Sequence, residues 1–373
     1  MNVDYSKKLE KLRSRRAAPS TFTKGGVTFD SVTAASSLKP ALESFEGKGQ
    51  GDATRYALGC IAEVPPEYTA ISLRDGERIA SQLKSQNVKD VETKLQGSVP
   101  LNIHIYTSSD VDLLVLAKWF VTLESPVQTP GSYTYLDITP SKELAALRTF
   151  CEAHLATRYP AADVNTSGAK SIAVSGGSLA RKVDVVPAHW VDTVEYQRTK
   201  IEKFRDVQIY DKSNKVAIRN SPFLHMAMVE NKDFQVDGYA KKAIRLLKCL
   251  ARDADSDIAI SSYDIASLIF HMEDSELRLP NVFFPLQLLN RVEFYLRWLE
   301  DNPYNASSLV TPDGSRKILD KPEKMVALKQ LREELTQAIE NIGAEYNNAV
   351  RYTFDNSRAH ELARAAVDSA VIY

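Results

Sequence analysis

The pattern of hydrophobic and polar positions along the chain changes near Pro222. Before that residue, short apolar runs and segments that alternate apolar with polar residues predict β-strands, because successive strand side chains point to opposite faces. The predicted strands cover residues 99–106, 111–116, 133–138, 171–174, 181–186, 207–210 and 215–219. Apolar residues at helical spacing predict helices over 72–86 and 141–159. We therefore expect a mixed α/β unit with a mostly β centre.

After Pro222 only helical spacing remains. The predicted helices cover residues 223–231, 238–253, 262–272, 285–301 and 322–346. The last of them has one apolar face from Met325 to Ile342, and packing in a core explains such a face better than a cofactor site does. The whole chain is thus predicted to be an α+β protein. It has an N-terminal extension (1–59), an α/β lobe (60–221) and a helical lobe (222–373).

Charge and cysteine content narrow the classes of function. The chain has 47 Lys and Arg against 48 Asp and Glu, so it lacks the basic surplus that a protein coating long nucleic acid needs. Its three cysteines are far apart and form no CxxC pair, which argues against a disulfide framework or a cysteine zinc site. No apolar stretch of ~18 residues predicts a membrane span. We expect a cytoplasmic protein that requires neither a membrane nor a long nucleic acid.

Three acidic residues lie in the predicted strands. Asp110 and Asp112 are two positions apart, so a strand would point both carboxylates to one face, and Asp184 lies in the predicted strand 181–186. Neighbouring carboxylates repel each other unless a cation lies between them, and Mg²⁺ or Mn²⁺ suits oxygen ligands. The alternative is that the two Asp residues form only a turn or a helix cap. Gly97-Ser98, twelve positions upstream of Asp110, favours a phosphate site, because Gly permits close backbone approach and Ser supplies a hydroxyl donor.

This arrangement resembles the signature of DNA-polymerase-β-type nucleotidyltransferases. The matching residues are Gly97-Ser98, then Ser109-Asp110-Val111-Asp112-Leu113, then Val183-Asp184-Val185-Val186-Pro187-Ala188. Within that superfamily the chain is most similar to the cGAS/DncV-like nucleotidyltransferases, which make cyclic oligonucleotide signals in bacterial anti-phage defence (CBASS). Further similar segments are Ser221-Pro222 with His225, Asn231, Ala243–Lys248 and Ser262-Tyr263. The resemblance covers roughly residues 60–340.

The resemblance implies a polymerase-β-like lobe with a mixed β-sheet, a helical-bundle lobe and an active site in the cleft between them. It implies that Asp110, Asp112 and Asp184 are catalytic and hold two Mg²⁺ or Mn²⁺ ions. The nucleotide-binding residues that it implies are Gly97, Ser98, Ser109, Arg245, Lys248, Ser262 and Tyr263.

The helix predicted over 238–253 carries a basic face. Lys241, Arg245, Lys248 and Arg252 share one side of it, so a stripe facing phosphates is geometrically available. The alternative is an ordinary solvated helix face.

The function that we expect is metal-dependent condensation of NTPs, ATP among them, into a cyclic di- or trinucleotide with release of pyrophosphate, by a monomer. One alternative keeps the fold and transfers nucleotides to an RNA 3′ end, a small molecule or a protein. Another is a non-catalytic nucleotide sensor, which the presence of all three acids disfavours. A requirement for an activating protein or ligand stays open.

Overall fold

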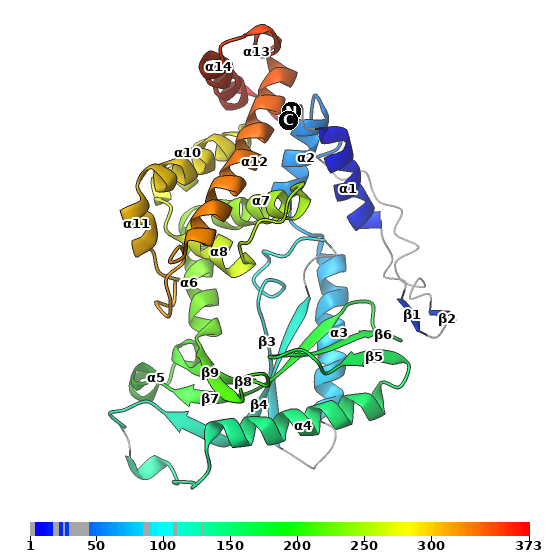
Figure 1. Cartoon of the computed structure of the whole chain (residues 1–373), viewed down its shortest axis with the longest axis vertical. Coiled ribbons are helices and arrows are strands. Elements are labelled where there is room, and N and C mark those ends of the chain that lie inside the picture. The colour runs from blue at the N-terminus through cyan, green and yellow to red at the C-terminus, as the bar shows by residue number, and fades with distance from the viewer. Residues whose placement is uncertain are drawn as a thin grey trace.

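A computed structural model describes residues 4–17, 22–24, 27–29, 45–84, 90–106, 110–128 and 130–373. Figure 1 shows a sheet lobe and a helical lobe, with helix α6 (Pro222–Gln235) running from the end of the sheet into the helical lobe. The predicted α+β architecture with a C-terminal helical lobe is confirmed.

The sheet lobe contains a mixed seven-stranded sheet. Its main path runs β3-β4-β7-β6-β5, and β8 pairs with both β7 and β9. The strands are β3 (Val91–Gln96), β4 (Val111–Leu123), β5 (Ala162–Asn165), β6 (Ile172–Gly176), β7 (Val183–Asp192), β8 (Asp206–Asp211) and β9 (Val216–Asn220). Strands β4 and β7 are parallel neighbours, and every other pair in this sheet is antiparallel. A separate short pair is formed by β1 (Phe22–Lys24) and β2 (Val27–Phe29).

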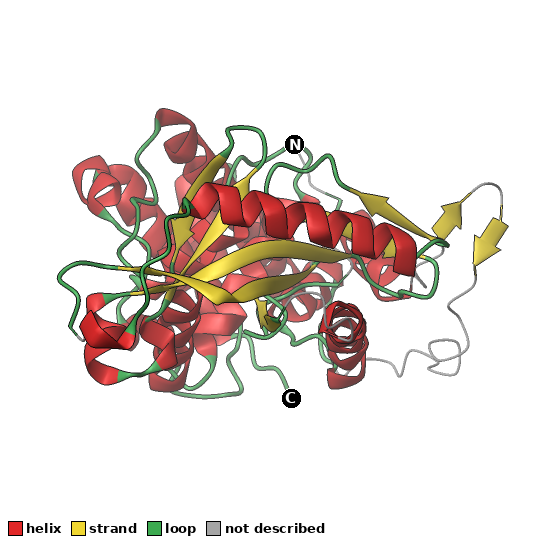
Figure 2. Cartoon of the chain, turned by 90° about the horizontal axis from the view of Figure 1, so that it is seen from below, coloured by secondary structure: helices red, strands yellow, loops and turns green. Residues whose placement is uncertain are grey.

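The two faces of the sheet have different neighbours. Helices α3 (Pro66–Lys84) and α4 (Pro140–Arg158) cover one face, and Figure 2 shows α4 lying across the strands. Leu113 and Val185 point to that side. The alternate residues Leu114 and Val186 point to the other side, where Phe223 of α6 packs against them. Because side chains alternate along a strand, Asp112 and Asp184 share this second face, which is turned toward the helical lobe.

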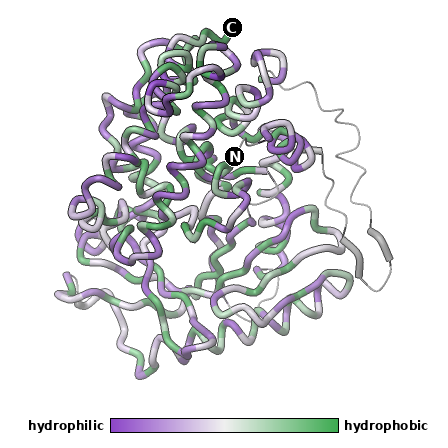
Figure 3. The backbone as a smooth tube through the Cα atoms, turned by 45° about the horizontal axis from the view of Figure 1, so that its top comes forward, coloured by the Kyte–Doolittle hydropathy of each residue, from purple (hydrophilic) through white to green (hydrophobic). Residues whose placement is uncertain are grey.

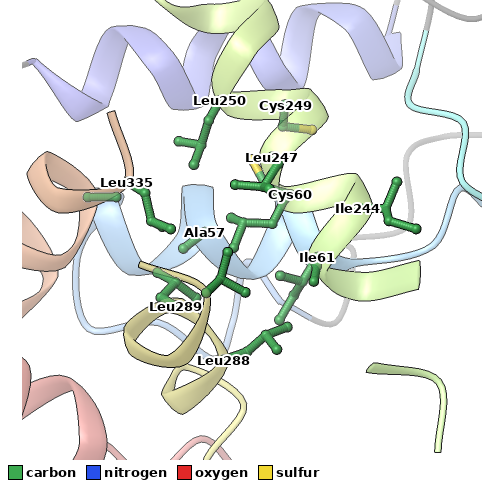
Figure 4. Packing of buried hydrophobic residues seen from close by; sticks show 14 of the residues in the cluster. Ala57, Cys60, Ile61, Ile244, Leu247, Cys249, Leu250, Leu288, Leu289 and Leu335 are labelled. Carbon is green, nitrogen blue, oxygen red and sulfur yellow. The ribbon is translucent and has the colours of Figure 1, made fainter. Parts of the chain in front are cut away.

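The helical lobe is built around a core shared by helices from both ends of the chain. Its helices are α1 (Tyr5–Ala17), α2 (Asp52–Ile61), α7 (Tyr239–Asp253), α8 (Ser262–Phe270), α9 (Asp274–Leu277), α10 (Gln287–Asp301), α11 (Pro303–Ser308), α12 (Pro322–Tyr346), α13 (Ala349–Tyr352) and α14 (Asn356–Ser369). Figure 4 shows Ala57 and Ile61 of α2 packed among Leu247 of α7, Leu288 of α10 and Leu335 of α12. The short helix α5 (Val194–Thr199) follows β7.

The N-terminal helices belong to this core rather than to a separate extension. Arg15 of α1 donates to Asp253 of α7, and the Tyr56 hydroxyl of α2 donates to the same carboxylate at 2.9 Å. The Glu345 carboxylate of α12 accepts from the backbone amides of Ala53 and Thr54 at the start of α2. The predicted boundary at residue 59 therefore does not separate these helices from the helical lobe.

Most predicted elements are present, and two predicted strands are wrong. Residues 99–106 form turns and an extended loop, in which Asn102 has a φ of 54°. Leu101, Ile103 and Ile105 of this loop are buried against the helical lobe. The alternation of apolar residues therefore results from packing against that lobe and not from strand pairing. Residues 133–138 are an irregular exposed segment. Strand β3 and helix α2 were not predicted, and residues 85–86 of the predicted helix 72–86 lie outside the described residues.

Hydrophobic and hydrophilic segments alternate along the helices, as Figure 3 shows. Among the described residues, no helix is long and apolar enough to cross a membrane.

Candidate active site between the lobes

A cavity of approximately 790 Å³ lies between the sheet and the helical lobe. Its sheet-side lining includes Gln96, Gly97, Ser98, Asp110, Asp112, Lys170, Asp184, Arg219 and Asn220. Its helical-lobe lining includes His225, Met226, Lys248, Ser262, Tyr263, Ala266, Asp313, Ser315 and Arg316. The structure therefore brings together eight of the ten implied catalytic and nucleotide-binding residues at this cavity: Gly97, Ser98, Asp110, Asp112, Asp184, Lys248, Ser262 and Tyr263.

The three acids meet because of the strand register. Asp112 of β4 lies directly opposite Asp184 of the parallel neighbour β7, and Asp110 immediately precedes β4. Asp112 also pairs with Gln96, the last residue of β3. The carboxylates of Asp112 and Asp184 therefore lie on the same face of the sheet, as the alternation of side chains along a strand predicts.

Lys182 lies between two of these carboxylates. Its Nζ donates to Asp110 Oδ2 at 2.6 Å and to Asp184 Oδ2 at 3.1 Å. Burial and the negative charges of Asp184 and Asp110 raise the pKa of Asp112 to about 7. Burial also raises the pKa of Asp184, which Lys182 partly offsets. The cluster thus holds more negative charge than one ammonium neutralises.

Gly97 makes the close approach to this cluster possible. Its φ is +82°, a left-handed conformation that Gly adopts without strain, and a Cβ there would lie 2.4 Å from Asp112 Oδ2. Ser98 follows in a turn that is closed by the hydrogen bond from the Ile103 amide to the Ser98 carbonyl. Ser109 lies outside the described residues.

The loop that follows Ser98 is held against α7 by two basic residues. Lys248 Nζ donates to the Ile103 carbonyl at 2.7 Å, and burial lowers the pKa of Lys248 to about 8. Arg245 donates to the carbonyls of Asn102 and Ile61 and is fully buried. Lys248 lines the cavity and Arg245 does not.

The prediction that Arg245 binds nucleotide is therefore corrected: its guanidinium is used to hold two loops to α7. The predicted basic stripe is corrected in the same way, because Lys241 pairs with Glu230 at 2.6 Å and only Lys248 among its members lines the cavity.

Helix α8 brings Ser262 and Tyr263 to the cavity. Ser261 caps this helix: its hydroxyl accepts from the Asp264 amide, while Asp264 accepts from the Ser261 backbone. Tyr263 stacks on His225 of α6, with ring centroids 3.8 Å apart and planes inclined by 19°. This cap and this stack fix the position of the first turn of α8 at the cavity wall.

Comparison with known proteins identifies the family of the chain. The chain is 35% identical to the cyclic dinucleotide synthase CdnE of Yersinia aleksiciae over 379 aligned positions, which cover 98% of this chain and 99% of that protein. The chain belongs to the CdnE cyclic dinucleotide synthases. It matches no protein-family model.

A second relative and a solved structure extend the comparison. The c-di-GMP synthase of Capnocytophaga granulosa is 31% identical over 306 positions, covering 75% of this chain and 85% of that protein. The solved structure of the STING-associated CdnE c-di-GMP synthase of the same organism has a TM-score of 0.70 and 27% identity, covering 92% of this chain and 99% of that one. The expected resemblance to cGAS/DncV-like nucleotidyltransferases is confirmed. This CdnE chain is a nucleotidyltransferase that condenses NTPs into a cyclic dinucleotide, and transfer to another acceptor is not favoured.

Several residues of the site were missed from the sequence. Lys182, which donates to Asp110 and Asp184, could have been found, because it lies two positions before Asp184 and so shares its strand face. Asp313, Ser315 and Arg316 lie on a loop between α11 and α12, and no local pattern places that loop at the cavity.

Proposed function

We propose that Asp110, Asp112 and Asp184 are the catalytic residues of the cyclic dinucleotide synthesis, with two Mg²⁺ or Mn²⁺ ions. The register that sets Asp112 opposite Asp184, with Asp110 beside them at the cavity wall, is the observation that carries this proposal.

The residues present fit divalent cations. Three carboxylates line one wall. Burial and the two acidic neighbours raise the pKa of Asp112, and a bound cation would relieve the repulsion between these carboxylates. Among the described side chains, no group of three acidic, His or Cys residues is already close enough together to hold an ion. Since Lys182 bridges Asp110 and Asp184, a bound divalent cation would displace its ammonium, and the carboxylates would then converge on the cation.

The ions and the residues of the cavity would have different roles in the reaction. When bound, the divalent ions would increase the acidity of the attacking hydroxyl and stabilise the charge on the leaving pyrophosphate. Gly97 and Ser98 would hold the triphosphate: Gly97 lets the phosphates approach the backbone closely, and the Ser98 hydroxyl donates a hydrogen bond. Lys248 and Ser262 would bind phosphate oxygens from the opposite wall, and Tyr263 would contact the nucleotide. We keep Ser109 in the proposed site on the resemblance alone.

Each bond-forming step is a displacement at phosphorus. The 2′- or 3′-oxygen of one nucleotide forms a bond to the α-phosphorus of the other, and the bond from that phosphorus to the pyrophosphate oxygen breaks. Asp184 orients the hydroxyl and accepts its proton. A second such step closes the ring, and positioning with charge stabilisation supplies most of the acceleration.

Some features of the function stay proposals. GTP is a candidate substrate beside the ATP predicted from the sequence, because the Capnocytophaga relative is named a c-di-GMP synthase. We propose that the product is a second messenger in anti-phage signalling, and that the enzyme is a cytoplasmic monomer. Synthesis by the purified chain alone would exclude a required activating protein or ligand.

The test is the double variant Asp110→Ala/Asp112→Ala, compared with Asp163→Ala, which replaces an exposed acid of β5 outside the cavity. Labelled NTPs are supplied without any acceptor, and phosphatase-resistant product is counted. We expect product from the wild type and the Asp163 variant, none from the double variant, and native circular dichroism in all three. Synthesis by a folded double variant would contradict the assignment.

A further inference from the structure

Asp313 is a carboxylate in the cavity wall whose two oxygens are buried and accept no regular hydrogen bond from the part of the chain that the structure describes. It lies in the turn between α11 and α12, where the Gly314 amide donates to the Thr311 carbonyl at 2.7 Å. Both of its carboxylate oxygens are buried, and neither has a hydrogen-bond partner among the described residues. A buried carboxylate without donors is unfavourable, so such a group facing a cavity indicates a ligand that brings the donors.

The neighbours of Asp313 do not satisfy it. Burial raises the pKa of the Tyr263 phenol, and the charge of Asp313 and a weak hydrogen-bonding interaction with it raise that pKa further. This contact does not reach the distance and angle of a regular hydrogen bond, so both Asp313 oxygens stay without a partner among the described residues. Arg316 is bound elsewhere: it pairs with Asp264 at 2.7 Å and donates to the Lys317 carbonyl. The carboxylate therefore keeps its accepting capacity for a molecule in the cavity.

Aromatic and apolar residues line the same side of the cavity as this carboxylate. His225 and Tyr263, whose rings stack on each other, line it together with Met226 and Ala266. His225 is 4% exposed, and its Nδ1 also has no partner within the described part of the chain. Planar rings next to unsatisfied polar atoms suit a planar, polar group such as a nucleobase.

The donor pattern of the four bases selects one of them. The Watson–Crick edge of guanine presents the N1–H and the 2-amino group side by side, which matches the two oxygens of a carboxylate. Adenine and cytosine present one donor beside an acceptor, and uracil presents one donor between two acceptors, so a carboxylate would face a lone pair. A site built on such paired bonds discriminates strongly against ligands that lack a partner.

We propose that Asp313 determines specificity by binding the N1–H and 2-amino groups of the guanine base of a GTP substrate. This inference rests on the proposed function, because it assigns one of the two nucleotides that the site condenses. Asp313 lies on the helical wall, away from the acids that carry the chemistry.

The test exploits the chemistry of Asp313→Asn. An amide accepts from N1–H but donates at its second position, so it matches xanthine, which has a carbonyl where guanine has the 2-amino group. Binding of the α,β-methylene analogues of GTP, ATP and XTP, which cannot release pyrophosphate, is measured by calorimetry with Mg²⁺. The matched control is Asp320→Asn, an exposed acid of the same loop outside the cavity.

We expect the wild type and the Asp320 variant to prefer the GTP analogue. Asp313→Asn should bind it about 10- to 100-fold more weakly and bind the XTP analogue more tightly than the wild type does. A gain of xanthine binding cannot result from misfolding. An unchanged order of preference in a folded Asp313→Asn protein would overturn the inference while leaving the proposed function intact. Failure of the wild type to bind any of the three analogues would instead contradict the proposed function.

Discussion

The two walls of the cavity differ in chemistry and in how they are built. The sheet wall carries the acids, placed by strand register on adjacent strands of one sheet. The helical wall carries an amine, a hydroxyl, stacked rings and a carboxylate that has no regular hydrogen-bond partner among the described residues, and these groups come from separate helices and loops. A rigid register suits atoms that must hold charge at fixed positions during reaction, whereas separate loops can vary with the ligand. We infer that the acids of the sheet wall perform the chemistry, that Gly97 and Ser98 hold the triphosphate from the same side, and that the helical wall selects the nucleotide and holds it from the other side.

The largest effect is expected from Asp184→Asn on the sheet wall. It keeps the shape of the side chain but removes the charge and the proton acceptor, so turnover should fall roughly 10³-fold or more. Nucleotide binding should change far less. Steady-state rates and calorimetric binding, with Asp163→Asn as the control, separate the two readouts. If the variant lost nucleotide affinity by as large a factor as turnover, the proposed separation of chemistry from nucleotide selection would be wrong.

Lys248→Met tests the opposite wall. The substitution keeps most of the length of the side chain and removes the ammonium, so affinity for the triphosphate should fall about 10- to 100-fold. The same helix offers the control Lys242→Met, whose Nζ lies 4.2 Å from the ring centroid of Tyr239 and does not line the cavity. Calorimetric titration of a nucleotide that cannot react gives the affinity directly. Wild-type affinity in the Lys248 variant would remove this residue from the site.

Lys182→Met tests whether its ammonium competes with divalent cations. Removing the charge that bridges Asp110 and Asp184 should tighten Mg²⁺ or Mn²⁺ binding by about 2- to 5-fold, a modest figure because the pair is partly exposed. Melting in EDTA should occur at a lower temperature than for the wild type, because the carboxylates then repel without a counter-ion. Lys170→Met is the control, an exposed cavity lysine. Weaker metal binding in Lys182→Met would show that the lysine supports the ion instead.

Glu345→Ala should affect stability and leave catalysis unchanged. The carboxylate caps α2 through two backbone amides and the Thr54 hydroxyl, so its loss should reduce the free energy of unfolding by about 1–3 kcal/mol. Chemical denaturation measures this against Glu333→Ala, which replaces an exposed residue of α12. A stability equal to that of the control would mean that α2 does not depend on this cap.

The sequence predicts the sheet wall better than the helical wall, for a physical reason. Alternation along a strand is local, so the shared face of Asp112 and Asp184 follows from spacing and strand pairing. The same rule fails for residues 99–106, where alternating apolar residues face another lobe from a loop. Asp313 and Arg316 depend on how a distant loop packs beside α8, which no local period encodes. The resemblance implies that Arg245 binds nucleotide, and the sequence cannot correct this, because a helix face does not reveal which backbone carbonyls will cover it.

The most direct test of the account is mass spectrometry of the product that the purified protein makes from all four NTPs with Mg²⁺, repeated with each NTP omitted in turn. We predict a phosphatase-resistant cyclic dinucleotide that is lost when GTP is omitted and that the Asp110→Ala/Asp112→Ala protein does not make. A linear product, nucleotide attached to another acceptor, or synthesis that continues without GTP would contradict the account.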